Sequence, residues 1–336
     1  ITKDLSFKSF YGIDYRTVFA ANYTDPRTID GFARRGLLQL NTYENINFMT
    51  NQTFNYNTTI GNKHSLSALL GVEYRSETRD YNFSSGEGFP TFQFQTMEAA
   101  ATPVNVTGTW SGFKRLGFFG QANYDYDKKY FASAVLRYDG SSRFGVNNRF
   151  GWFPSISGAW AIDQEDFLKG ADWIDQLKLR LSYGETGNDQ VDNFASRGLY
   201  SGDRPYNALP GLRPRSIENQ DLKWERNVTY NIGLDMAFFD SRVALTAEAF
   251  RRTSKDLLLE QPLPYTSGYE NIARNLGELR NQGLEFSLST VNIRSNSFNW
   301  TSSFNITFID NKVTKLYDGL DVLPGDQTTR VGSPLY

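Results

Sequence analysis

Apolar and polar residues alternate one by one along most of this 336-residue chain. In the segment 114–127, Leu116 and Phe118 share one side of an extended backbone. Arg115 and Gln121 share the opposite side. Because successive side chains of a strand point to opposite sides, the pattern predicts a strand with one apolar and one polar face. The same alternation recurs in the segments 176–187, 223–239 and 298–309.

The alternation predicts an all-β chain of about eleven strands, many of them longer than the roughly five to six residues of an average strand. These strands are expected near residues 4–16, 44–60, 64–81, 114–127, 130–141, 152–163, 176–187, 223–238, 243–258, 281–290 and 298–312. The segment 164–175 is expected to be a turn that contains a helical piece.

The composition excludes several classes of protein. The chain has no cysteine and a single histidine, so disulfides, thiolate catalysis and metal centres rich in cysteine or histidine are not expected. Lys and Arg number 35 against 37 Asp and Glu, and this near-neutral balance argues against a nucleic-acid-binding protein. No apolar run reaches the roughly 18 residues of a transmembrane helix.

Long and short connections alternate between the predicted strands. The long ones lie near 17–43, 82–113, 188–222 and 259–280, and the short ones at 61–63, 127–129, 240–242 and 291–297. A soluble sandwich has no reason to collect its long loops at one end, whereas an outer-membrane barrel has short periplasmic turns and long extracellular loops. We therefore predict a transmembrane antiparallel β-barrel, as a single domain over residues 1–336, with its apolar face toward lipid and its polar face toward an enclosed lumen.

Aromatic residues are placed near both ends of several predicted strands. Those near short turns are Tyr124, Tyr126, Tyr130, Phe238 and Phe298, and those near long loops are Tyr138, Trp152, Tyr183 and Trp224. Amphipathic rings favour the two membrane–water boundaries, so we interpret these residues as two girdles. The alternative is that aromatic residues simply favour strands.

Several runs of sequence carry a family resemblance. They are RYDGSSRFG (137–145), RFGWFPSISGAWAI (149–162), LKLRLSYGETGND (177–189), NQDLKWE (219–225) and NLGELRNQGLEFSL (275–288). In this order and spacing, they resemble the SusC/RagA-type TonB-dependent outer-membrane transporters of Bacteroidetes. The resemblance implies a Gram-negative outer-membrane barrel of about 22 strands with an N-terminal plug. It also implies a SusD-like surface lipoprotein as a lid and energy from the TonB–ExbB–ExbD complex.

The chain departs from a complete family member, because no plug, TonB-box region or terminal barrel strands match. The resemblance is clearest over 114–316 and looser over 1–113. We therefore expect an incomplete barrel at both ends, since an open sheet edge is not tolerated in lipid. The remaining parts of the same barrel would complete it.

Two sets of side chains are candidates for contact with a ligand. Aromatic residues in the long loops could stack on sugar rings, pack loop against loop, or touch a lid protein: Trp110, Phe113, Tyr200, Tyr206, Tyr265 and Tyr269. Three arginines on predicted lumen faces could line an import path or pair with carboxylates of a plug: Arg115, Arg137 and Arg180.

The predicted function is import through the outer membrane of oligosaccharides or, as a second option, peptides. No catalytic residue, metal site or cofactor is expected, because His64 has no partner histidine or cysteine. A passive porin, a soluble carbohydrate-active β-protein and an adhesive surface protein stay open as alternatives. The enzyme would need paired carboxylates across a cleft, whereas Asp235, Glu248 and Glu285 are scattered on predicted lumen faces.

Overall fold

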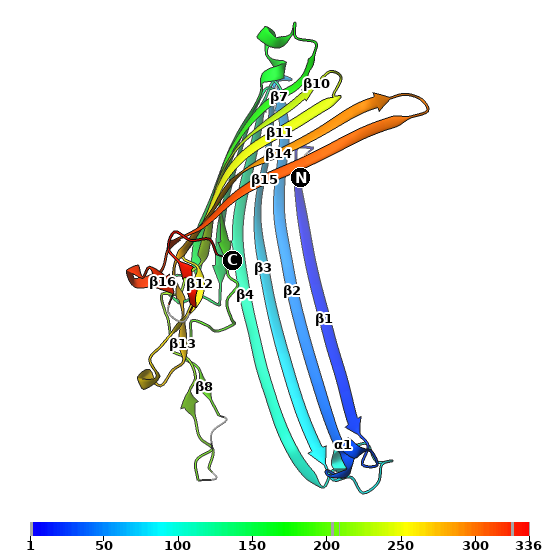
Figure 1. Ribbon diagram of the computed structural model, residues 1–336, viewed down its shortest axis with the longest axis vertical. Helices are drawn as coiled ribbons and strands as arrows, with labels where there is room; N and C mark the ends of the chain where they lie inside the picture. Colours follow the sequence, from blue (N-terminus) through cyan, green and yellow to red (C-terminus); the bar gives the residue numbers. More distant parts are fainter. Residues whose placement is uncertain (1–2, 203–204, 208, 324–325, 336) are drawn as a thin grey trace. The chain divides into compact units, whose positions relative to one another are not determined.

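The computed structural model describes residues 3–202, 205–207, 209–323 and 326–335. Its main element is an eleven-stranded sheet in the order β1-β2-β3-β4-β5-β6-β7-β10-β11-β14-β15 (Figure 1). The strands are β1 (Leu5–Thr24), β2 (Leu37–Ile60), β3 (His64–Glu87), β4 (Thr102–Tyr126), β5 (Tyr130–Ser141), β6 (Phe150–Ala161), β7 (Ile174–Asn188), β10 (Glu225–Phe238), β11 (Val243–Lys255), β14 (Glu278–Arg294) and β15 (Asn299–Lys315). The all-β prediction is confirmed, and each expected strand has its counterpart.

The remaining elements are short. Three two-stranded sheets pair β8 (Tyr200–Ser201) with β9 (Arg213–Pro214), β12 (Leu258–Pro262) with β13 (Asn271–Asn275), and β16 (Val322–Leu323) with β17 (Asp326–Arg330). Single helical turns are α1 (Ile29–Phe32), η1 (Met97–Ala99), η2 (Ile162–Gln164), η3 (Asp166–Leu168), η4 (Tyr265–Ser267) and η5 (Tyr317–Gly319). The helical piece expected in 164–175 is thus present as η2 and η3. Within the described part of the chain, no helix has the length and apolar character needed to cross a membrane.

Four strands are longer than the sequence predicts. Because β1 to β4 continue, the connections expected at 17–43 and 82–113 shrink to 25–36 and 88–101. The added part of β4 alternates Val104 and Val106 with polar residues, but threonine and glycine weaken the pattern. The short turns behave as hairpins should: Gly61 and Asn62 have φ of 60° and 62°, typical of a turn that matches strand twist.

The chain divides into two compact units. The first unit comprises Ile1–Lys8, Gln52–Val72 and Gly117–Tyr336, and the second comprises Ser9–Asn51 and Glu73–Leu116.

In the first unit, strand register aligns the apolar side chains into rows. One row consists of Gly158, Leu181, Ile232, Ala249, Leu284 and Phe308, and a parallel row of Leu179, Leu234, Ala247, Phe286 and Ile306. These rows face solvent: Leu181 is 50% exposed and Phe308 56%. A water-soluble protein would seal such rows inside a core, so their exposure favours a face made for lipid.

The opposite face of the same strands is polar and paired. Arg180 donates to Asp235 at 2.7 Å and reaches Glu248 at 3.5 Å. Thr246 also donates to Asp235, at 3.3 Å. Cross-strand pairs therefore satisfy the charges on this face, as the desolvation cost of charged groups requires.

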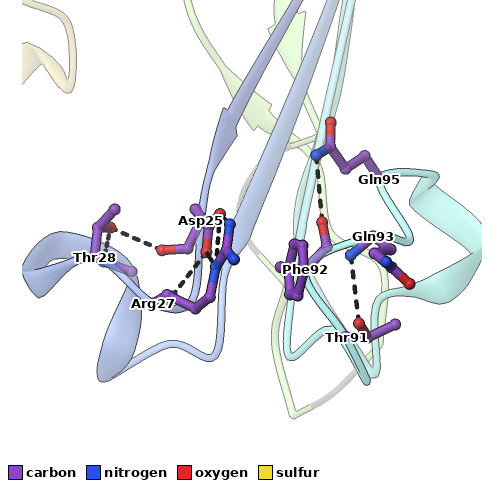
Figure 2. A network of polar contacts seen from close by, with 8 residues as sticks. Asp25, Arg27, Thr28, Thr91, Phe92, Gln93 and Gln95 are labelled. Carbon is purple, nitrogen blue, oxygen red and sulfur yellow. Dashed lines mark hydrogen bonds and ion pairs between the residues drawn. The ribbon is translucent and has the colours of Figure 1, made fainter.

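In the second unit, the connections 25–36 and 88–101 are joined. Backbone hydrogen bonds run from Gly88 to Arg34 at 3.0 Å and from Phe89 to Arg35 at 2.8 Å. Figure 2 shows Asp25 and Arg27 on one connection and Phe92 on the other; Arg27 binds Asp25, and its guanidinium lies 3.5 Å from the centre of the Phe92 ring. The two connections thus form one tip.

Candidate functional site

A small hydrophobic cluster lies where the connections leave β5, β6 and β10 in the first unit. It consists of Phe144, Phe153, Leu222 and Trp224, all under 9% exposed. The Trp224 ring lies 4.8 Å from that of Phe144, and its indole nitrogen donates to the Arg149 carbonyl at 3.0 Å. The girdle interpretation is therefore wrong for Trp224, because a residue at 7% exposure among loop side chains does not face lipid.

A buried polar network adjoins this cluster. Ser141 donates to the Asp189 carboxylate at 3.0 Å, and Arg143 donates to the Asp189 carbonyl at 3.0 Å and to Asn193 at 2.8 Å. Asp189 is 1% exposed, so its charge depends on these partners. The network joins the connection 142–149 to the connection 189–224. Sequence reasoning missed Arg143 and Asp189, because nothing in their spacing indicates that they meet.

Backbone contacts tighten the same junction. The backbone N–H of Gly145 donates to the Leu222 carbonyl at 2.9 Å, and that of Asn147 donates to the Gln220 carbonyl at 3.2 Å. The side-chain amide of Asn147 also donates to the Asp221 carboxylate at 2.8 Å. A Cβ atom placed on Gly145 would lie 2.0 Å from the Gln220 carbonyl oxygen. Only glycine allows this approach.

Asparagine side chains attach a third connection, 256–277. Asn219 donates to the Ala273 carbonyl at 2.8 Å. Asn275 donates to the Lys223 carbonyl at 2.7 Å and accepts from the Lys223 backbone N–H at 2.8 Å. The connections 142–149, 189–224 and 256–277 therefore form one body, which we call the loop body.

The loop body contains a cavity of about 550 Å³. Two of the predicted aromatic residues, Tyr200 and Tyr269, line it together. Arg149, Arg197 and Glu218 also contribute to the lining, and the rest comes from small, polar and aliphatic residues. Two phenol rings beside guanidinium and carboxylate groups can stack on a ligand ring and hydrogen-bond its polar substituents. This cavity is the candidate binding site.

The other predicted aromatic residues lie elsewhere. Tyr206 and Tyr265 are 84% and 93% exposed and are not among the residues that line the cavity. In the second unit, Trp110 and Phe113 belong to β4, although the sequence places them in a loop. Trp110 is 60% exposed, whereas Phe113 is 6% exposed.

The predicted lumen arginines have partners within the chain. Arg137 binds Asp139 at 3.0 and 2.9 Å, and Arg180 binds Asp235 and Glu248 as described above. The Arg115 guanidinium lies 5.8 Å from the centre of the Phe113 ring. Pairing with carboxylates of the sheet itself, on the same strand for Arg137 and on other strands for Arg180, is a third use of such arginines, beside the two that the sequence suggests.

An antiparallel sheet with one exposed apolar face, one paired polar face and a structured loop body defines the wall of a transmembrane β-barrel. The family model for the β-barrel of TonB-dependent receptor-like proteins matches residues 2–335, and the chain belongs to this family. The family resemblance read from the sequence is thereby confirmed, and the chain is part of an outer-membrane barrel.

Curated relatives agree with this assignment. TonB-dependent receptor P39 of Formosa agariphila is 35% identical over 318 residues, which are 94% of this chain and 30% of that protein. TonB-dependent receptor SusC of Bacteroides thetaiotaomicron is 33% identical over 275 residues, which are 78% of this chain and 27% of that protein. The chain thus spans about a third of the length of the curated relatives it matches.

Among solved structures, the RagAB peptide transporter superposes with a TM-score of 0.92 at 28% identity. The match covers 99% of this chain and 38% of the transporter chain. Nearly the whole chain, connections included, therefore superposes on one part of that transporter chain.

Proposed function

We propose that this chain forms part of the barrel wall of a TonB-dependent outer-membrane importer and that its loop body contacts the imported molecule. The cavity lined by Tyr200 and Tyr269 supports this proposal most directly, because it lies among the long connections, at the end that faces outward in such barrels. The work is binding, gating and passage, with no bond made or broken.

The proposed cargo is an oligosaccharide. Tyrosine rings in a cavity wall suit the stacking of sugar rings, and Arg149, Arg197 and Glu218 suit their hydroxyl groups. A peptide is the second candidate, since the same side chains can bind a peptide backbone and its termini. The likeness to the RagAB peptide transporter favours this alternative.

The proposed partners follow from the relatives. Likeness to SusC and to the RagAB transporter supports a SusD-like lipoprotein over the extracellular mouth and energy from the TonB–ExbB–ExbD complex. A passive porin would need neither. A soluble carbohydrate-active protein would not leave rows such as Leu181 and Phe308 facing out.

Ligand binding by the complete gene product tests the proposal. Tyr200→Ala and Tyr269→Ala should each weaken binding of the cognate oligosaccharide or peptide about three- to tenfold, the usual contribution of an aromatic pair. Tyr265→Ala, a tyrosine 93% exposed outside the cavity, is the matched control and should bind normally. Calorimetry against neutral oligosaccharides, acidic oligosaccharides and short peptides identifies the class. Equal losses in all three variants, or none, would refute a role for the cavity.

A further inference from the structure

The apolar face of the first unit ends at a definite level. Tyr183 and Tyr230 face each other in register with ring centres 5.1 Å apart, and Arg251 is the register partner of Tyr230 on the next strand. One step toward the short turns, the same face carries Leu181 and Ile232. Because tyrosines mark the membrane–water boundary of barrels, Arg251 lies at the outer boundary on the lipid side.

A surface hollow of about 470 Å³ lies beside Arg251 on β11, β14 and β15. Leu284 and Phe308 line it below that boundary, and Arg251, Gln282 and Asp310 line it at the boundary. The hollow is therefore apolar toward the membrane centre and polar toward the outside. An acyl chain with a polar head has the same arrangement.

Positive charge gathers around the polar end of this hollow. Arg280 and Lys312 are direct register partners, one step beyond Gln282 and Asp310 on the same face. Like charges directly opposite each other destabilise a sheet, so an anion between them would offset the repulsion. The Asp310 carboxylate is already engaged, since it accepts from Gln282 at 3.2 Å and pairs with Lys312 at 3.2 Å.

Arg280 carries a second indication. Its Nε atom is buried and has no hydrogen-bond partner among the described residues. Because this Nε atom has no exposed surface, a lipid phosphate would bind the guanidinium through its terminal nitrogens, which carry the same charge. Arg280 lies outside the lining of the hollow, but it is one register step from Gln282, the partner of Arg251, so the two arginines are diagonal neighbours that can share one phosphate group.

We propose that this hollow, which we call the outer-leaflet hollow, binds a phosphate-bearing lipid of the outer leaflet. Leu284 and Phe308 contact its acyl chain, and Arg251 and Arg280 bind its phosphate. The site is on the lipid-facing side, so it is separate from the cavity of the loop body and does not depend on the identity of the cargo.

Native mass spectrometry of the complete, folded gene product tests this proposal, with bis-phosphorylated lipid A as the probe. The wild-type protein should retain bis-phosphorylated lipid A at least fivefold better than enzymatically dephosphorylated lipid A. Arg251→Gln should reduce retention of the phosphorylated form about fivefold, the contribution of one arginine near an anionic lipid surface. Arg252→Gln removes the same charge from the adjacent residue on the other face of β11, and it should retain the lipid fully.

Three outcomes would overturn the assignment. They are equal retention of the two lipid A forms by the wild-type protein, unchanged retention by Arg251→Gln, and an equal loss in Arg252→Gln. The comparison of the two lipids uses only wild-type protein, so it decides the question even if a variant fails to fold. Cargo binding should be unaffected in each variant.

Discussion

Substitution of Gly145 by alanine should loosen the loop body without unfolding the barrel. The new Cβ would lie 2.0 Å from the oxygen and 2.3 Å from the carbon of the Gln220 carbonyl. Carbon and oxygen normally stay more than about 3 Å apart, and backbone atoms cannot rotate away, so the two connections must separate by about 1 Å. Overpacking of this kind costs about 1–3 kcal/mol.

Limited proteolysis measures that cost. Arg197 and Arg215 lie in the connection 189–224 and are trypsin sites. When opening is fast relative to cleavage, the cleavage rate follows the open population, so 1–3 kcal/mol corresponds to about 5- to 150-fold faster cutting. The heat-dependent shift of the protein on a gel should show that the barrel itself stays folded.

Gly170 provides the matched control, because a Cβ atom there meets nothing within 4 Å. Gly170→Ala should be cut at the wild-type rate. The reasoning fails if Gly145→Ala is as resistant as the wild type, or if Gly170→Ala is equally sensitive.

Three further predictions concern other contacts. Trp224→Ala should destabilise the loop body by about 3–5 kcal/mol in urea-dependent proteolysis, because the substitution removes a buried ring. Trp152 is 57% exposed, so Trp152→Ala should have little effect, and equal effects of the two substitutions would contradict the placement of Trp224. Hydrogen bonds from Tyr130, Trp160 and Lys129 lower the pKa of Glu165 in the turn 162–173. The ionised Glu165 side chain therefore stabilises the folded protein fully above the usual carboxyl pKa of 4.5, and this stabilisation is lost as the pH falls through the lowered pKa. The unfolding midpoints of wild type and Glu165→Gln should therefore converge as the pH falls, and a gap that does not narrow in acid would count against this account. In the second unit, Arg27→Ala should speed amide hydrogen exchange in 88–101 about two- to fivefold, because the substitution removes the contact of the guanidinium with the Phe92 ring. Unchanged exchange would show that backbone hydrogen bonds alone hold the connections 25–36 and 88–101 together.

The sequence predicted the sheet well because the signal is local and repeated. Alternation such as that of Leu179 and Leu181 reports directly which face a side chain occupies. Where threonine, asparagine and glycine replace the apolar residues, as around Val104 and Val106, the contrast fades, and the start of this strand was predicted twelve residues too late.

The site was less predictable because it depends on contacts between distant segments. Tyr200 and Tyr269 were recognised as candidates by residue type, but their convergence on one cavity required the loop body. Trp224 and Trp152 look alike in sequence, and only packing distinguishes the buried ring from the exposed one. Arg143 and Asp189 are separated by a hairpin, and no periodicity connects them.

The way in which Asn219, Asn275 and Gly145 fasten three connections to one another constrains how recognition can be re-engineered. A chimera in which only one of these connections is replaced would leave asparagine amides without partners and a steric conflict where the foreign connection meets the native ones. Grafting 142–149, 189–224 and 256–277 together keeps the contacts among the three connections internal to the donor, and Ser141 and Phe153 of the strands should be transferred with them. Ligand specificity in such barrels should therefore be exchanged by transferring the whole loop body, not individual loops.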